Sequence, residues 1–390
     1  MHTASEIMGG LYIHIPFCVK KCVYCDFYSV TDLSGTVSFP ASLEREMQLA
    51  GHTPLAFDTL YIGGGTPSVL GAAAIEQIIA AAFGNFKIRS DAEATIEVNP
   101  GTVTQDDLVR YRQAGGNRLN IGVQSFHEKN LRFLGRIHTA KEALSAFDRA
   151  RRAGFDNVGL DLIYGLPEQD KGNWLDDLDR ATRLNPEHLS CYMLTCETGT
   201  PLDRDVKSGR TQLPVDDTLR ELFETTIEYL ASHGFFHYEV SNFARITEDG
   251  RTPWMSRHNW KYWSLAPYIG LGPSAHSFIE PDRRWNHRSL EKYLQDIRAG
   301  KLPIADKEQL TREQMIMETI YLGFRTTAGV DLAKFQKRCS LNFLKYFEAT
   351  ISEFEKDDLL KVTKTHCALT RKGMILLDSI TAVFTNQDVA

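Results

Sequence analysis

The feature that most constrains the fold is a regular alternation of short apolar runs with amphipathic segments in the first half of the chain. Six apolar runs predict strands, at 11–15, 59–62, 94–98, 118–123, 158–163 and 189–194. Amphipathic segments between them predict helices, at 42–49, 74–82, 105–114, 140–153 and 174–184. Strands that alternate with helices form parallel β/α units. We therefore predict an α/β fold, a partial (β/α)6 barrel of the TIM type.

Polar or glycine-rich clusters follow directly after several of these strands. They are a cysteine cluster, Gly63-Gly64-Gly65-Thr66-Pro67, Asn99-Pro100-Gly101, Gln124-Ser125 and Gly165-Leu166-Pro167. The carboxyl ends of parallel strands meet at one face, where β/α barrels build their sites. Gly and Pro also terminate strands, but that role does not account for the cysteines. The sequence therefore predicts a functional site at this face.

The alternation stops after residue 194. A predicted helix at 216–233 leads to a strand-like run at 236–243 and an aromatic, glycine-rich stretch that ends near Trp285. The last part of the chain predicts helices at 313–324, 341–356 and 371–383, with strands at 359–363 and 367–370. We expect three units: a barrel core at 1–240, a connecting region at 241–305 and a winged-helix-like α+β domain at 306–390.

Charge and composition narrow the function classes. The net charge of -6 disfavours a general nucleic-acid binder, which usually has a basic face. The last ninety residues carry 13 basic and 12 acidic side chains, so packing or docking suits this unit better than DNA binding. No apolar run has the length of a membrane span, and Met1–Gly10 lacks the features of a secretory signal. Seven cysteines, an odd number, disfavour a disulfide framework. We expect a cytoplasmic protein.

Three of the cysteines, Cys18, Cys22 and Cys25, lie together after the first predicted strand. Cysteine thiolates bind Fe–S clusters. Three thiolates on one loop would hold three corners of a 4Fe–4S cubane and leave the fourth iron open to another ligand. Lys20 and Lys21, within the same loop, would favour deprotonation of the thiols.

A structural zinc site is the alternative, and it needs four ligands. Only His14 is close enough in sequence to be the fourth, and we place it on the first strand. Side chains alternate along a strand, so Tyr12 and His14 share one face while Leu11, Ile13 and Ile15 take the other. This placement favours the Fe–S interpretation.

The run Tyr12-Ile13-His14-Ile15-Pro16-Phe17-Cys18, with its C-x3-C-x2-C spacing, resembles the radical S-adenosylmethionine superfamily. Within it, nearly the whole chain is similar to oxygen-independent coproporphyrinogen III oxidases and their heme-chaperone relatives, the HemW family. The resemblance implies the barrel type of that superfamily. It also implies a 4Fe–4S cluster on the three cysteines, with S-adenosylmethionine bound to the open iron by its amino and carboxylate groups.

The resemblance further implies a set of contacts to S-adenosylmethionine. They are Tyr12, Tyr24, Gly64, Gly65, Thr66, Glu97, Gln124, Arg136 and Asp161. The glycine-rich turn would let the backbone approach the amino group, to which Glu97 would add a carboxylate. Arg136 suits a carboxylate, Asp161 would accept hydrogen bonds from the ribose, and Tyr24 would lie near adenine. Singly, Glu97 or Asp161 could be a strand-end ion pair and Arg136 a surface residue, but their joint order favours the functional interpretation.

Two features separate the branches of this family. The oxidases resemble C-x3-C-x2-C-x-C, and Phe27 stands here at the position of the fourth cysteine. They also carry a long N-terminal arm, for which the 17 residues before Cys18 are too few. Both features favour a chaperone over an oxidase, so we assign no catalytic residue and leave the enzyme question open.

The motif His258-Asn259-Trp260-Lys261-Tyr262-Trp263 matches the HNxxYW pattern of the heme-chaperone branch. The resemblance implies heme binding by His258, Asn259, Tyr262 and Trp263, because imidazole ligates heme iron and flat aromatics can cover a porphyrin. An aromatic stretch with a histidine can equally be structural. The rival ligands are His276, His237, His287, Cys191 and Cys196.

The predicted function is therefore heme binding and delivery to an unidentified acceptor protein, with a reductant for the cluster as a further partner. The first alternative is radical oxidative decarboxylation of coproporphyrinogen III. The second is radical chemistry on an unrelated substrate, because fold and cofactor do not determine the substrate.

Overall fold

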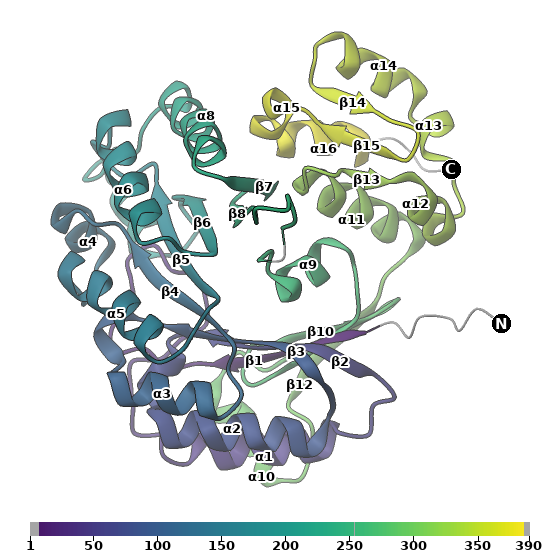
Figure 1. Cartoon of the computed structure of the whole chain (residues 1–390). Helices are drawn as coiled ribbons and strands as arrows, with labels where there is room; N and C mark the ends of the chain where they lie inside the picture. The colour runs from purple at the N-terminus through teal and green to yellow at the C-terminus, as the bar shows by residue number, and fades with distance from the viewer. Residues whose placement is uncertain (1–7, 253, 386–390) are drawn as a thin grey trace.

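The computed structural model describes residues 8–252 and 254–385 of the 390-residue chain (Figure 1). Residues 1–7, which belong to the stretch without features of a secretory signal, lie outside the described part, as do Pro253 and residues 386–390. Within the described part no helix is both long and apolar enough to cross a membrane.

Six parallel strands form the centre of the main sheet, in chain order. They are β1 (Gly9–Ile15), β2 (Ala56–Gly64), β3 (Lys87–Val98), β4 (Arg118–Gln124), β5 (Val158–Tyr164) and β6 (His188–Met193). The segments between them are α1 (Phe39–Ala50), η1 (Pro67–Leu70), α2 (Ala72–Asn85), η2 (Pro100–Thr102), α3 (Gln105–Gln113), α4 (Glu128–Leu134), α5 (Ala140–Arg152) and α6 (Lys171–Arg183). The helices lie on the convex side of the curved sheet (Figure 1). The predicted partial β/α barrel is confirmed.

Helix α5 shows how local sequence and packing agree. Thr139 and Glu142 form a capping box that satisfies backbone N–H groups at the start of the helix. Ala143, Phe147 and Ala150 recur at helical spacing and are buried against the sheet. The helix therefore forms on the outside of the barrel with its charged face toward solvent.

The main sheet continues beyond the barrel strands on both sides. Beyond β1 lie β9 (Tyr268–Leu271), β10 (His276–Ile279), β11 (Asp282–Asn286) and β12 (Ile304–Gln309). Beyond β6 lie β8 (Asn242–Arg245) and β7 (Phe235–Glu239), so the strand-like run at 236–243 is a hairpin. The region expected to connect two domains, 241–305, thus contributes strands to the main sheet. Strands of four to six residues are too short to show a clear alternation in the sequence.

The remaining helices of this part are α7 (Pro201–Lys207), α8 (Asp216–Ser232), α9 (Arg257–Trp263) and α10 (Leu290–Arg298). Helix α9 lies on the concave side of the curved sheet (Figure 1). Because it contains the HNxxYW motif, this placement puts the motif inside the open barrel rather than on the outer surface.

The C-terminal part forms a separate three-stranded sheet with helices around it. Its elements are α11 (Arg312–Arg325), β13 (Val330–Asp331), α12 (Leu332–Cys339), α13 (Phe343–Tyr346), α14 (Glu348–Lys356), β14 (Leu360–Val362), β15 (His366–Leu369), α15 (Arg371–Ile375) and α16 (Leu377–Thr385). The helices predicted at 341–356 and 371–383 are each divided in two, at Phe347 and Leu376.

Candidate functional site

A cavity of about 620 Å³ lies at the carboxyl ends of the barrel strands, a volume typical of small-molecule sites. The predicted residues that line it are Cys18, Cys22, Tyr24, Cys25, Gly64, Gly65, Thr66, Glu97, Gln124, Arg136 and Asp161. Tyr12 does not line this cavity, and its hydroxyl bonds His14 Nδ1 at 3.0 Å. Residues that are far apart in sequence are therefore brought together, because the strands that carry them are parallel neighbours.

The cysteine loop forms one wall of the cavity, and its three thiols are free and half-buried. The Cys18 Sγ lies 3.4 Å from the Thr66 hydroxyl. Arg136 Nη1 lies 3.6 Å from the Cys22 Sγ. Burial raises the pKa of Cys25 to about 11, and the charge of Lys21 lowers it only in part. Lys21 therefore favours deprotonation of Cys25 as the sequence predicts, but burial has the larger effect on the pKa.

The geometry does not favour a single metal ion at these thiols. Among residues 8–252 and 254–385, no three His, Cys, Asp or Glu side chains converge as ligands of one ion. His14, the only candidate for a fourth zinc ligand, has both ring nitrogens engaged, by the Tyr12 hydroxyl at 3.0 Å and the Tyr28 carbonyl oxygen at 2.8 Å. A cubane binds each thiolate at a different iron, so its ligands need not converge on one point.

Among the predicted residues that line the cavity, three buried polar atoms have no hydrogen-bond partner within the part of the chain that the structure describes. They are Gln124 Oε1, Arg136 Nε and Asp161 Oδ1. Buried polar groups are normally paired, so such atoms indicate a polar ligand or ordered water. Gln124 also has a φ of 70°, a strained conformation for a residue with a side chain. Two acceptors and one donor suit the ribose and the carboxylate of S-adenosylmethionine.

The carboxylate of Glu97, which lines the cavity, accepts hydrogen bonds at both of its oxygens. Its Oε1 accepts from the Tyr61 hydroxyl at 2.6 Å, and its Oε2 accepts from the Gly64 N–H at 3.1 Å. Burial raises the pKa of Glu97 to about 7. Gly64 has a φ of 107°, and a Cβ there would lie 2.5 Å from His14 Nδ1, so only glycine fits. The remaining lone pairs of the carboxylate can face a ligand amino group.

Several further polar residues that the sequence did not predict also line the cavity. They are Tyr61, Thr95, Arg118, Asn120, His188, Ser190 and Tyr192. His188 Nδ1 is buried and has no hydrogen-bond partner among the described residues. The alternation of polar and apolar residues along two strands could have predicted some of them. Arg118 and Asn120 on β4 alternate with buried apolar residues, as do His188 and Ser190 on β6.

The structure does not present His258 as an open ligand. The side chain is 1% exposed, with Nδ1 2.8 Å from the Thr59 hydroxyl and Nε2 2.9 Å from the Tyr262 hydroxyl. Burial lowers its pKa to about 3, so the ring is neutral at physiological pH. Of the other motif residues predicted to contact heme, Asn259 lines the 620 Å³ cavity, and the guanidinium of Arg325 lies 4.6 Å from the centre of the Trp263 ring.

The rival ligands differ in accessibility. His276 is exposed on β10 and stacks on Trp285 at 5.7 Å between ring centres. His287 is paired with Asp296, whereas His237 stacks on Phe243. Cys191 is buried and Cys196 is half-buried. His276 is therefore the most open of the histidines considered.

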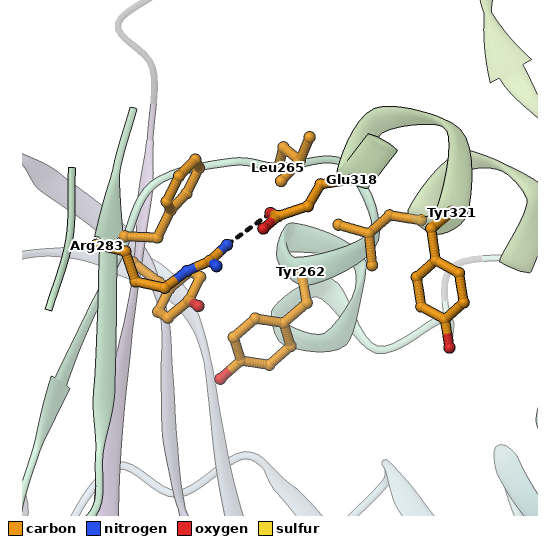
Figure 2. Close-up of a pocket in the computed structure, with 8 residues that line it drawn as sticks. Tyr262, Leu265, Arg283, Glu318 and Tyr321 are labelled. Carbon is orange, nitrogen blue, oxygen red and sulfur yellow. Dashed lines mark hydrogen bonds and ion pairs between the residues drawn. The ribbon is translucent and has the colours of Figure 1, made fainter. Parts of the chain in front are cut away.

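Tyr262 faces a second, smaller cavity of about 320 Å³ (Figure 2). The cavity lies between the end of α9, strands β9 to β11 and helix α11. Arg283 pairs there with Glu318 at 2.5 Å, and this contact joins the main sheet to the C-terminal part. Arg283 also pairs with Glu308 at 3.1 Å, and the rest of the lining is aromatic or aliphatic.

Comparison with known proteins identifies the family. Residues 12–181 match the Radical SAM superfamily, and residues 310–376 match the HemN C-terminal domain. The heme chaperone HemW of Bacillus subtilis (strain 168) is 32% identical over 381 residues, which cover 97% of this chain and 99% of that protein. The chain belongs to the HemW family. Heme chaperone HemW of Escherichia coli (strain K12) is 40% identical over 281 residues, 70% of this chain and 71% of that protein.

The fold of this HemW-family chain is also similar to that of a solved structure, the coproporphyrinogen III oxidase HemN of Escherichia coli. The TM-score is 0.83 at 26% identity, over 98% of this chain and 91% of that chain. At the position where the resemblance places a fourth cysteine in the oxidases, Phe27 lines the 620 Å³ cavity and is 69% exposed.

Proposed function

We propose that this HemW-family chain binds heme and transfers it to an acceptor protein, and that it carries a 4Fe–4S cluster whose open iron binds S-adenosylmethionine. The observation that carries the proposal is identity of 32% to a protein named heme chaperone HemW along nearly the whole chain. The cavity adds support, because it joins three thiols to unpaired polar groups in one chamber.

Separate groups of residues would bind the cluster and S-adenosylmethionine. Cys18, Cys22 and Cys25 would hold the cluster, and Glu97 would accept a hydrogen bond from the amino group of S-adenosylmethionine. The unpaired Oδ1 of Asp161 would accept from a ribose hydroxyl. When bound, the cluster and S-adenosylmethionine supply one-electron chemistry, for which an external reductant is the expected partner.

Heme binding is proposed for the chain without a fixed axial ligand. Ligation by His258 would require the ring to leave its bonds with Thr59 and Tyr262 and its buried position. His276, which is exposed and stacked on Trp285, is the first alternative. We also propose a cytoplasmic location, because all seven cysteines are free thiols and a reducing compartment keeps thiols in that state.

The test begins with anaerobic reconstitution of the cluster, followed by titration with hemin and measurement of the Soret band. Transfer is then measured by mixing the heme-loaded chain with an apo-acceptor protein. We expect one heme per chain and no conversion of coproporphyrinogen III to protoporphyrinogen under reducing, anaerobic conditions. Robust turnover of coproporphyrinogen III would replace the chaperone assignment with the oxidase alternative.

A further inference from the structure

We propose that His258 of the HNxxYW motif is a positioning residue for the S-adenosylmethionine site, acting on Glu97 through Tyr61. The inference rests on the proposed function, because it takes Glu97 as the group that receives the amino end of S-adenosylmethionine. It deepens that function by giving the motif a role inside the barrel. The role follows from two contacts in series, from α9 to β2 and from β2 to β3.

The first link is the contact between His258 and Tyr61. Their rings are stacked, with centres 5.0 Å apart and planes inclined by 29°. Tyr61 lies on β2 two residues after Thr59, whose hydroxyl bonds His258 Nδ1 at 2.8 Å. Both residues point to the same side of the strand, because side chains alternate along it. The imidazole is thus bonded at one residue of β2 and stacked on the next residue of that face.

The second link is the hydrogen bond from the Tyr61 hydroxyl to Glu97 Oε1, at 2.6 Å. Hydrogen bonds to a carboxylate are short and strong when buried. The other oxygen of Glu97 is bonded to the Gly64 backbone, so Tyr61 decides how the carboxylate is rotated toward the cavity. A shift of the Tyr61 ring would therefore change the position of the group that meets the ligand.

Helix α9 is anchored so that His258 cannot move freely. Its first N–H groups are bound by Glu93 of β3, whose Oε2 accepts from Arg257 at 3.2 Å and whose Oε1 accepts from His258 at 3.1 Å. Lys261 pairs with Asp58 at 2.6 Å. A carboxylate at a helix N-terminus satisfies free N–H groups and interacts favourably with the helix dipole. Helix α9 is thus fixed to β2, which carries Tyr61, and to β3, which carries Glu97.

The motif also reaches the cavity directly. Asn259 and the helix cap Ser256 line the same 620 Å³ chamber as the cysteine loop. On the other side of His258, Tyr262 bonds Nε2 and lines the smaller cavity beside the C-terminal part. His258 therefore lies between the two cavities, with neither ring nitrogen free.

The experiment measures the affinity of the reconstituted, reduced chain for S-adenosylmethionine by anaerobic calorimetry, and the change that the ligand causes in the cluster's EPR signal. The variants are His258→Ala, Tyr61→Phe and their combination. We expect the Kd to rise about tenfold in each single variant, as for loss of a hydrogen bond to a buried charged group. The Kd of the double variant should be no higher than that of the single variant that binds more weakly, because both changes interrupt the same series of contacts.

Matched controls separate positioning from general damage. His233→Ala removes an exposed histidine that also stacks on an aromatic ring, that of Tyr229 at 4.0 Å between ring centres, and it should leave the Kd unchanged. His258→Gln, whose amide can bond both hydroxyls, should recover part of the affinity and of the EPR change. If His258→Ala does not fold, Thr59→Val tests the same tether with an isosteric side chain, and its Kd should rise as in Tyr61→Phe.

Hemin titration of the same variants distinguishes this inference from the proposed function. We expect His258→Ala to bind hemin with the wild-type Soret band. Loss of that band with an unchanged Kd for S-adenosylmethionine overturns the inference and makes His258 a heme ligand. A wild-type chain that binds S-adenosylmethionine but no heme contradicts the chaperone proposal, while the affinities of the variants still decide the role of His258.

Discussion

The affinity for S-adenosylmethionine should depend on pH through Glu97. This carboxyl group is buried between Tyr61 and Gly64, and burial raises its pKa to about 7. Its ionised form is the better acceptor for the ligand's amino group. As the pH falls through 7 the group becomes protonated, so the affinity should be highest above pH 7 and decrease below it.

The size of the effect follows from the pKa of about 7. The ionised fraction of Glu97 falls from about nine-tenths at pH 8 to about one-tenth at pH 6, so the affinity should fall roughly tenfold, or about 1.4 kcal/mol. The assay is anaerobic calorimetry of the reconstituted chain with S-adenosylmethionine at pH 6, 7 and 8. An EPR titration of the reduced cluster provides an independent value of the Kd.

The control is Glu97→Gln, which keeps the shape of the side chain and cannot ionise. The amino group of S-adenosylmethionine titrates as well, and the variant retains that contribution, so the difference between the two proteins isolates Glu97. We expect a weaker Kd in Glu97→Gln and a flatter pH dependence. Equal pH dependence in both proteins would refute the assignment of Glu97 to the amino group.

Three further predictions test other parts of the chain. Iron and sulfide analysis of the reconstituted wild type should give about four irons and four sulfides per chain, and Cys22→Ala should abolish the cluster. Stoichiometric zinc in the native protein would contradict this prediction. Asp161→Ala should weaken S-adenosylmethionine binding by about 1 to 3 kcal/mol in calorimetry, because polar partners lose their acceptor; an unchanged Kd would remove Asp161 from the site. Buried Glu46, whose pKa is raised to about 7 by burial, contributes stability that is present at low pH and lost as the pH rises through 7. Between pH 6 and pH 8 the free energy of unfolding of the wild type, measured in urea, should therefore decrease by about 1.4 kcal/mol more than that of Glu46→Gln. Equal decreases in the two proteins would contradict a raised pKa for the buried Glu46 carboxyl group.

The sequence by itself determined the barrel and the cavity. The strands β1 to β6 have local apolar runs, and each parallel connection requires a helix, so their order and direction follow from the pattern. Residues at the ends of such strands, from Cys18 to Asp161, must then meet at one face. This is why the three cysteines and every S-adenosylmethionine contact that the resemblance implies, except Tyr12, line the 620 Å³ cavity.

Only the tertiary structure decided the surroundings of the HNxxYW motif. The sequence gives His258 the same aromatic neighbours whether it lies on the surface or in the core. Its burial depends on Thr59, which is 199 residues away in sequence, and on the ring of Tyr61. The sheet extension by β9 likewise depends on pairing with β1, more than 250 residues earlier. Contacts between such distant segments arise from the packing of complete elements, and no local period in the sequence encodes them.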